Sequence, residues 1–128
     1  MTDEEFVAAF ENCTLPLTSF RHADHVRMAF LYLSKYSPLD ALRNFSTSLA
    51  RFATAHGKTS LYNATITWAY MLIIQERLAR VEQRQNWVEF AAANQDLLDR
   101  DDSVLNKYYR EETRMSDFAR STFVFPDK

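Results

Sequence analysis

Two histidines, His22 and His25, are the residues of this chain whose type and spacing best suit them to chemistry. They stand three positions apart, so on a helix both rings lie on one face and can contact the same ligand. An apolar stripe at helical spacing follows them, formed by Val26, Ala29, Phe30 and Leu33. Because the pair continues this stripe backwards by one turn, we expect both imidazoles to face the protein interior.

The pair falls in the first turn of the expected helix, where unpaired N–H groups and the helix dipole disfavour added positive charge. This position favours the neutral imidazole, which is the form that binds a metal ion. The pair can therefore serve as ligands of a divalent metal, and the residue types do not distinguish zinc, iron, manganese and copper. Its other chemical use is as a general acid and base.

Three interpretations of His22 and His25 stay open: metal ligands, buried side chains held by hydrogen bonds, and half-exposed residues at the helix entrance. A catalytic metal site usually has three protein ligands, and the pair supplies two. No spacing selects the third among the candidates, which are Asp24, His56, Glu111 and Glu112.

Other polar side chains are candidate neighbours of the pair. Tyr62 and Glu112 are further candidate catalytic residues, and Asn63, Thr65 and Tyr108 are candidate pocket residues. Aromatic side chains at helical spacing more often belong to the core, so the tyrosines have that interpretation as well. His56 has an alternative role at the carbonyl end of its own helix.

The sequence predicts mainly helices to position these residues, because the chain has only one Gly and three Pro. Thr2 to Glu5 form a capping-box pattern, Pro38 suits a first helical position, and Gly57 suits the position after a helix end. The expected long helices are 3–13, 21–36, 38–56 and 61–81. Three shorter helical segments follow: one capped by Asn86, one that begins at Asp102, and one that spans 113–121. The last residues, 123–127, are expected to be extended and to dock on the body.

These elements predict an all-α fold: a single-domain bundle of five to seven helices over residues 1–128, with a short extended C-terminal tail. The length of 128 residues suits one domain with one core.

Composition excludes some classes of function. The net charge is −2 and no basic block stands out, so we expect no nucleic-acid partner. The longest apolar run is far shorter than the roughly 20 residues of a membrane span, and the acidic N-terminus lacks a signal-peptide pattern. The single cysteine, Cys13, allows no intramolecular disulfide, so a cytoplasmic location is expected. Cys13 itself is expected to be a small core residue.

The chain resembles a family of small uncharacterised bacterial all-helical proteins with a Phe-x-His-x-x-His-Val-Arg motif. The resemblance covers nearly the whole chain and rests on residues 20–29, 31–33, 51–53, 55–57, 61–62, 65–67, 89–90, 94, 108–112 and 123–127. The family also has a Tyr-His-Glu-Thr-Ile-Thr motif, which implies a histidine and a glutamate near the first pair and a metal centre of three ligands and a carboxylate. Here Asn63 and Ala64 replace those two residues, so the implied centre is altered.

Two functions follow as alternatives. The first is a metal-dependent or acid–base enzyme that acts on a small organic molecule in an inward-facing polar pocket at His22 and His25. The second is a non-catalytic ligand-binding or protein-interaction module, a homodimer among its forms, in which the histidines are structural. The sequence does not decide whether the chain is an enzyme.

Overall fold

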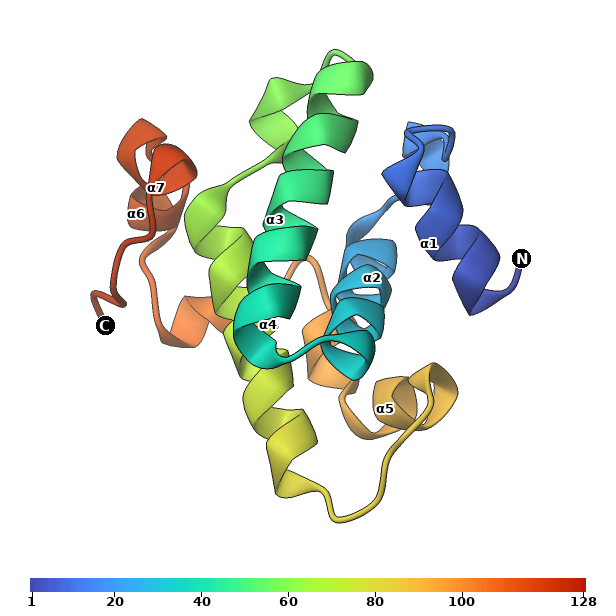
Figure 1. Cartoon of the computed structure of the whole chain (residues 1–128). Helices are drawn as coiled ribbons and strands as arrows, with labels where there is room; N and C mark the ends of the chain where they lie inside the picture. The colour runs from blue at the N-terminus through green and yellow to red at the C-terminus, as the bar shows by residue number, and fades with distance from the viewer. The chain divides into compact units, whose positions relative to one another are not determined.

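The computed structural model describes all residues, 1–128, and contains seven α-helices and no strand (Figure 1). The expected all-α class is therefore confirmed. The chain forms two compact units, Met1–Tyr62 and Asn63–Lys128. The single-domain organisation of residues 1–128 stays a prediction. None of the helices combines the length and apolarity that crossing a membrane requires.

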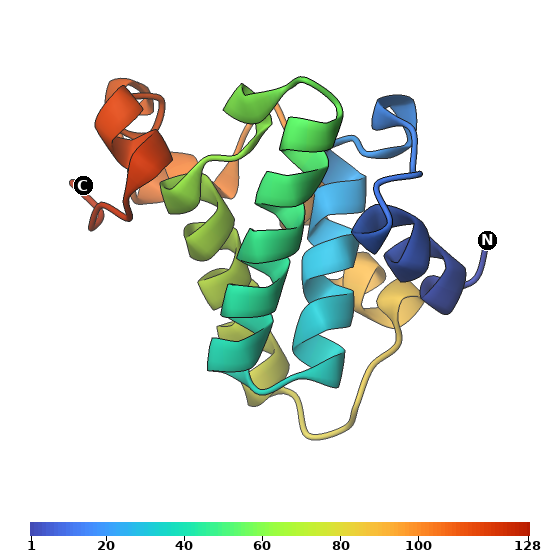
Figure 2. The same ribbon diagram turned by 45° about the horizontal axis from the view of Figure 1, so that its top comes forward.

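Unit 1 consists of three α-helices and two short 3-10 segments. The helices are α1 (Asp3–Glu11), α2 (His22–Lys35) and α3 (Pro38–Ala55), and the 3-10 segments are η1 (Leu17–Ser19) and η2 (Thr59–Leu61). Only residues 36 and 37 connect α2 to α3, so the two helices pack side by side as an antiparallel pair (Figure 2).

The predicted start signals of α1 and α3 are confirmed. The Glu5 backbone N–H donates to the Thr2 hydroxyl at 3.1 Å, and the Thr2 N–H donates to the Glu5 carboxylate at 2.8 Å. Pro38 occupies the first position of α3, where its missing N–H has no partner to lose. Gly57 follows the end of α3 with a φ of 67°, the left-handed conformation that glycine adopts without strain.

α1 ends at Glu11, two residues earlier than the sequence pattern predicts, because Cys13 takes a left-handed φ of 61°. The Cys13 N–H donates to the Phe10 carbonyl at 3.1 Å and the Thr14 N–H to the Ala9 carbonyl at 2.9 Å. This pair of bonds is a Schellman motif, in which glycine is the usual left-handed residue. The helix therefore ends five residues before Pro16.

Phe10 anchors α1 to the core of unit 1. Its ring is fully buried and contacts Phe20 and Phe52 at centroid distances of 5.0 and 5.3 Å. Phe45 at 5.8 Å and Tyr32 at 6.3 Å complete the cluster. Because these four rings come from α2, α3 and the segment that precedes α2, one side chain of α1 holds all three parts of the unit together.

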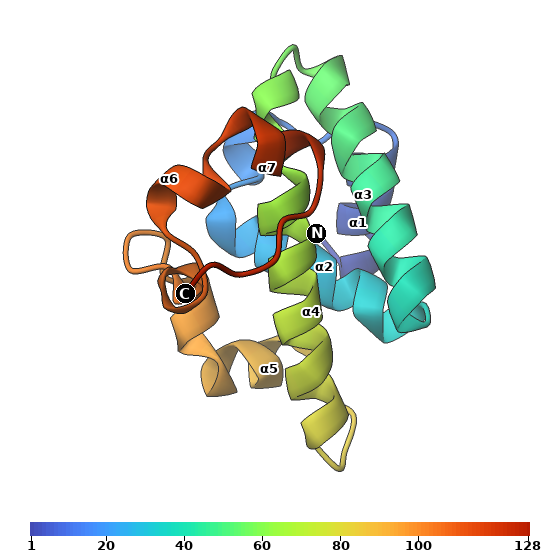
Figure 3. The same cartoon turned by 90° about the vertical axis from the view of Figure 1, so that its left-hand side faces the viewer.

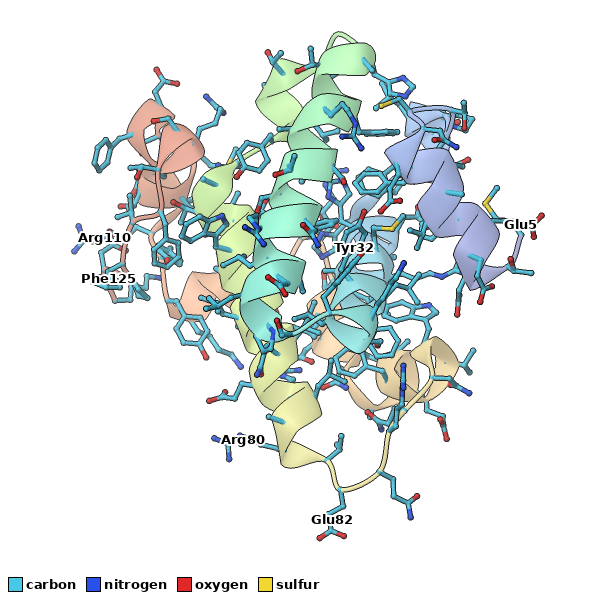
Figure 4. The ribbon with its side chains drawn as sticks, in the orientation of Figure 1. Glu5, Tyr32, Arg80, Glu82, Arg110 and Phe125 are labelled. Carbon is cyan, nitrogen blue, oxygen red and sulfur yellow. The ribbon has the colours of Figure 1, made fainter.

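Tyr32 carries the polar contact of this core (Figure 4). Its hydroxyl donates to Glu11 Oε2 at 2.5 Å and lies 3.3 Å from Ser48 Oγ. Burial, followed by the hydrogen bond to Glu11, raises the pKa of Tyr32. The hydroxyl therefore stays protonated, and it links the end of α1 to the middle of α2 and α3.

Unit 2 is built around α4 (Ala64–Arg80), which contacts α7 and the 3-10 segment η4 (Figure 3). The remaining elements are α5 (Trp87–Ala93), η3 (Gln95–Leu98), η4 (Val104–Lys107), α6 (Glu111–Arg114) and α7 (Asp117–Ser121). α4 starts three residues later than predicted, since residues 59–61 form a separate 3-10 turn. The predicted Asn86 cap of α5 is confirmed by the Glu89 N–H, which donates to Asn86 Oδ1 at 2.8 Å.

The C-terminal tail, residues 122–128, has no regular secondary structure and lies against the rest of unit 2, as the sequence predicts for residues 123–127. The Tyr109 hydroxyl donates to the Val124 carbonyl at 2.6 Å, and Phe123 stacks on Trp68 with ring centroids 5.5 Å apart. In Figure 3 the tail is the red segment that runs from α7 across α4.

Candidate functional site

His25 lies against the aromatic core of unit 1. Its ring packs on buried Phe20 with a centroid distance of 3.9 Å and an interplanar angle of 31°. Burial, and then the positive charge of His22 when that ring is protonated, lower the pKa of His25 to about 4. At physiological pH the His25 imidazole is therefore neutral.

The start of α2 fixes the direction of this ring. The backbone N–H of Arg21 donates to the Asp24 carboxylate at 2.9 Å, and the His25 N–H donates to the Arg21 carbonyl at 3.0 Å. Asp24, one candidate third metal ligand, thus holds the first turn of its own helix. His22 is half-buried at the first helical position, one turn before His25.

The third histidine, His56, belongs to the same aromatic cluster but is separated from His25 by two phenylalanine rings. Phe20 contacts Phe52 at 5.0 Å, and Phe52 contacts His56 at 4.4 Å. The His56 Nε2 atom is buried without a hydrogen-bond partner. Within either unit, no group of three or more His, Cys, Asp and Glu side chains is arranged to hold a metal ion.

Asn63, a predicted pocket residue, is a structural link in unit 2. Its Oδ1 accepts the Ile66 N–H at 2.9 Å, which caps the N-terminus of α4. Its Nδ2 donates to the Arg114 carbonyl at 2.8 Å, which ties α4 to the end of α6. The sequence signal for this role is the residue type itself, because asparagine is among the side chains preferred at a helix N-cap.

Thr65 is fully buried and holds the C-terminal tail. Its hydroxyl donates to the Thr122 carbonyl at 2.9 Å and accepts the Val124 N–H at 3.1 Å. Glu112 is exposed on α6, and Tyr108 is 42% exposed beside the tail. Tyr62 is half-buried at the last position of unit 1. The structure thus brings together His22 and His25, and in unit 2 it gives Asn63 and Thr65 bonds to backbone groups.

We predict that Asn63→Ala lowers the free energy of unfolding by about 2 kcal/mol, because it removes both the helix cap and the bond to the Arg114 carbonyl. Asn63→Asp keeps the acceptor for the Ile66 N–H but loses the donor to Arg114, so it should cost less. Urea titration followed by circular dichroism measures both variants. Equal losses in the two variants would contradict the separate roles of the two amide atoms.

Fold and site together define a class: an all-helical protein with a half-buried, neutral histidine that packs on an aromatic ring at the start of a core helix. Comparison of the chain with protein-family models, with curated proteins and with solved structures gave no match in any of the three. The resemblance to the bacterial helical family stays a prediction.

Proposed function

We propose that this chain is a non-catalytic binding protein for a small organic molecule, with its site at the start of α2, where His22 and His25 lie. The observation that carries the proposal is the packing of the His25 ring on buried Phe20, where the pKa of His25 is lowered to about 4. A general acid or base works best when its pKa lies near the working pH. A neutral imidazole that does not exchange its proton near pH 7 is suited to hydrogen bonding.

The surroundings of His25 support a ligand with a flat apolar part. The His25 ring packs on the buried ring of Phe20 at a centroid distance of 3.9 Å. A neutral imidazole offers one N–H donor and one acceptor nitrogen. The ligand class that suits this arrangement is a small aromatic molecule with a hydroxyl or amide group.

Metal binding is the second candidate, because the neutral form of His25 is also the form that coordinates a metal ion. The histidine pair supplies two ligands, and Asn63 and Ala64 stand where the resembled family has a histidine and a glutamate. Zinc, iron, manganese or copper would therefore need a third ligand from another position or from the bound molecule.

The test is binding measured with a panel of small phenols and aromatic amides by ligand-detected NMR, and with zinc by equilibrium dialysis. His25→Phe keeps a ring on Phe20 but removes the nitrogens, so we expect at least tenfold weaker binding in this variant. The matched control is His56→Phe, which should leave binding unchanged. A panel that does not bind, or that binds His22→Ala/His25→Phe as well as the wild type, would refute the proposal. Zinc retained by the wild type alone would favour the metal alternative.

A further inference from the structure

The C-terminal tail is held in the way that a protein holds a bound peptide. Thr65 pairs with main-chain atoms of the tail on both sides of Phe123, since its hydroxyl donates to the Thr122 carbonyl and accepts the Val124 N–H. The Tyr109 hydroxyl donates to the Val124 carbonyl. Contacts to the main chain of an extended segment supply affinity that depends little on its side chains.

Two side chains of the tail add specificity. Phe123 stacks on Trp68 at an interplanar angle of 18°. Four residues later, the Asp127 carboxylate accepts the Arg110 backbone N–H at 3.0 Å and the Thr113 hydroxyl at 2.5 Å. These bonds lower the pKa of Asp127, so the carboxylate is charged at neutral pH.

The tail leaves one polar group of this surface unsatisfied. The Trp68 Nε1 atom is buried beside the stacked Phe123 and has no hydrogen-bond partner. Buried donors are normally paired, so an occupant with an acceptor at this place would fit better than the tail does. Phe125, which follows Phe123 along the tail, is 81% exposed, so its ring adds little to the docking (Figure 4).

We propose that the tail-binding surface, formed by Thr65, Trp68, Tyr109, Arg110 and Thr113, is a recognition site for an extended peptide of a partner protein. The peptide carries an aromatic residue and an acidic residue four positions further on. The chain's own tail occupies the site and is exchanged for the partner peptide. All five residues and the tail belong to unit 2, so the site is complete within that unit.

The experiment uses a fluorescent peptide with the sequence of residues 121–128 and the full-length chain. In the variant Phe123→Ala/Asp127→Asn the tail loses its two side-chain anchors, while every residue of the tail-binding surface is kept. A tethered tail competes at an effective concentration on the order of millimolar. We therefore expect the variant to bind the peptide at least tenfold more tightly than the wild type, as measured by fluorescence anisotropy.

Two matched controls test the contacts. A peptide with alanine and asparagine at the positions of Phe123 and Asp127 should bind the variant at least tenfold more weakly. Adding Thr65→Val to the variant keeps the shape of residue 65 but removes the hydroxyl, and should also weaken binding. Equal binding of both peptides, or of the peptide to wild type and variant, would overturn the proposal.

A measurement on the wild type keeps the proposal testable if the variant fails to fold. Millimolar peptide should displace the tail and speed hydrogen exchange at the Val124 amide, which donates to the Thr65 hydroxyl while the tail is docked. An unchanged exchange rate would contradict displacement. A wild-type chain that is a dimer by light scattering and takes up no peptide would mean that two copies exchange their tails, and would overturn the assignment to a separate partner.

Discussion

Phe10→Ala should lower the free energy of unfolding by about 3–5 kcal/mol, the range for truncation of a fully buried phenylalanine. The Phe10 side chain is fully buried and contacts four other rings of unit 1. Removing it leaves a cavity where α1, α2 and α3 meet, and only Phe6 remains as a buried anchor of α1. Guanidinium titration followed by circular dichroism at 222 nm measures the loss.

The matched control is Phe118→Ala, since Phe118 is 69% exposed on α7. Truncation there should change the free energy of unfolding by less than about 0.5 kcal/mol. If both variants lose the same stability, the ring cluster around Phe10 is not what holds α1. Phe10→Leu should fall between the two, because leucine refills part of the cavity.

The long elements of the fold could be predicted because local signals agree with burial. In α3, Phe45, Leu49 and Phe52 recur at helical spacing, and all three are buried. Pro38 and Gly57 mark its two ends by backbone chemistry that few other residues offer. The same logic failed at α1, whose end depends on a left-handed cysteine that no local signal indicates.

Short helical segments were harder to predict, because packing and side-chain bonds define them more than periodicity does. The expected segment 113–121 is two helices, α6 and α7, since Ser116 caps α7 through the Ala119 N–H at 3.1 Å. The region after Asp102 forms only the 3-10 segment η4, which begins with the Leu105 N–H bonded to Ser103 Oγ at 3.1 Å. Ser103 and Ser116 are both recognisable in the sequence as possible caps. The sequence does not indicate whether a cap or the neighbouring apolar pattern decides where the helical segment begins.

In the candidate site, too, local spacing predicts the position of one residue but not the partners of others. The position of His25 follows from the apolar stripe of α2, which carries its ring onto Phe20. The role of Thr65, and the Asn63 bond to the Arg114 carbonyl, depend on backbone atoms about 50 to 60 residues away along the chain. Sequence spacing within one helix carries no information about such distant partners, so these two residues were predicted as pocket residues.

Acid should destabilise the wild-type chain through His25. The unfolded chain binds a proton at this side chain with a pKa near 6.5, whereas in the fold the pKa is about 4. Between these two values the unfolded state holds more protons, so the free energy of unfolding falls as the pH drops from 6.5 to 4. The full difference corresponds to about 3 kcal/mol, and at pH 7.5 the contribution disappears because both states are neutral.

His25→Phe isolates this effect, because it keeps an aromatic ring on Phe20 and removes the titrating group. The carboxylates of Asp96 and Asp127, whose pKa values are lowered, destabilise both proteins alike at acid pH and cancel in the comparison. Urea titrations at pH 7.5, 6.5, 5.5 and 4.5 give the unfolding free energy of each protein. The value for the wild type minus that for the variant should therefore decrease steadily as the pH falls below 6.5. A difference that stays constant over this range would mean that the folded chain accepts a proton on His25 as readily as the unfolded one. In that case His25 is a protonatable group near neutral pH, and the acid–base enzyme becomes the better proposal for this site.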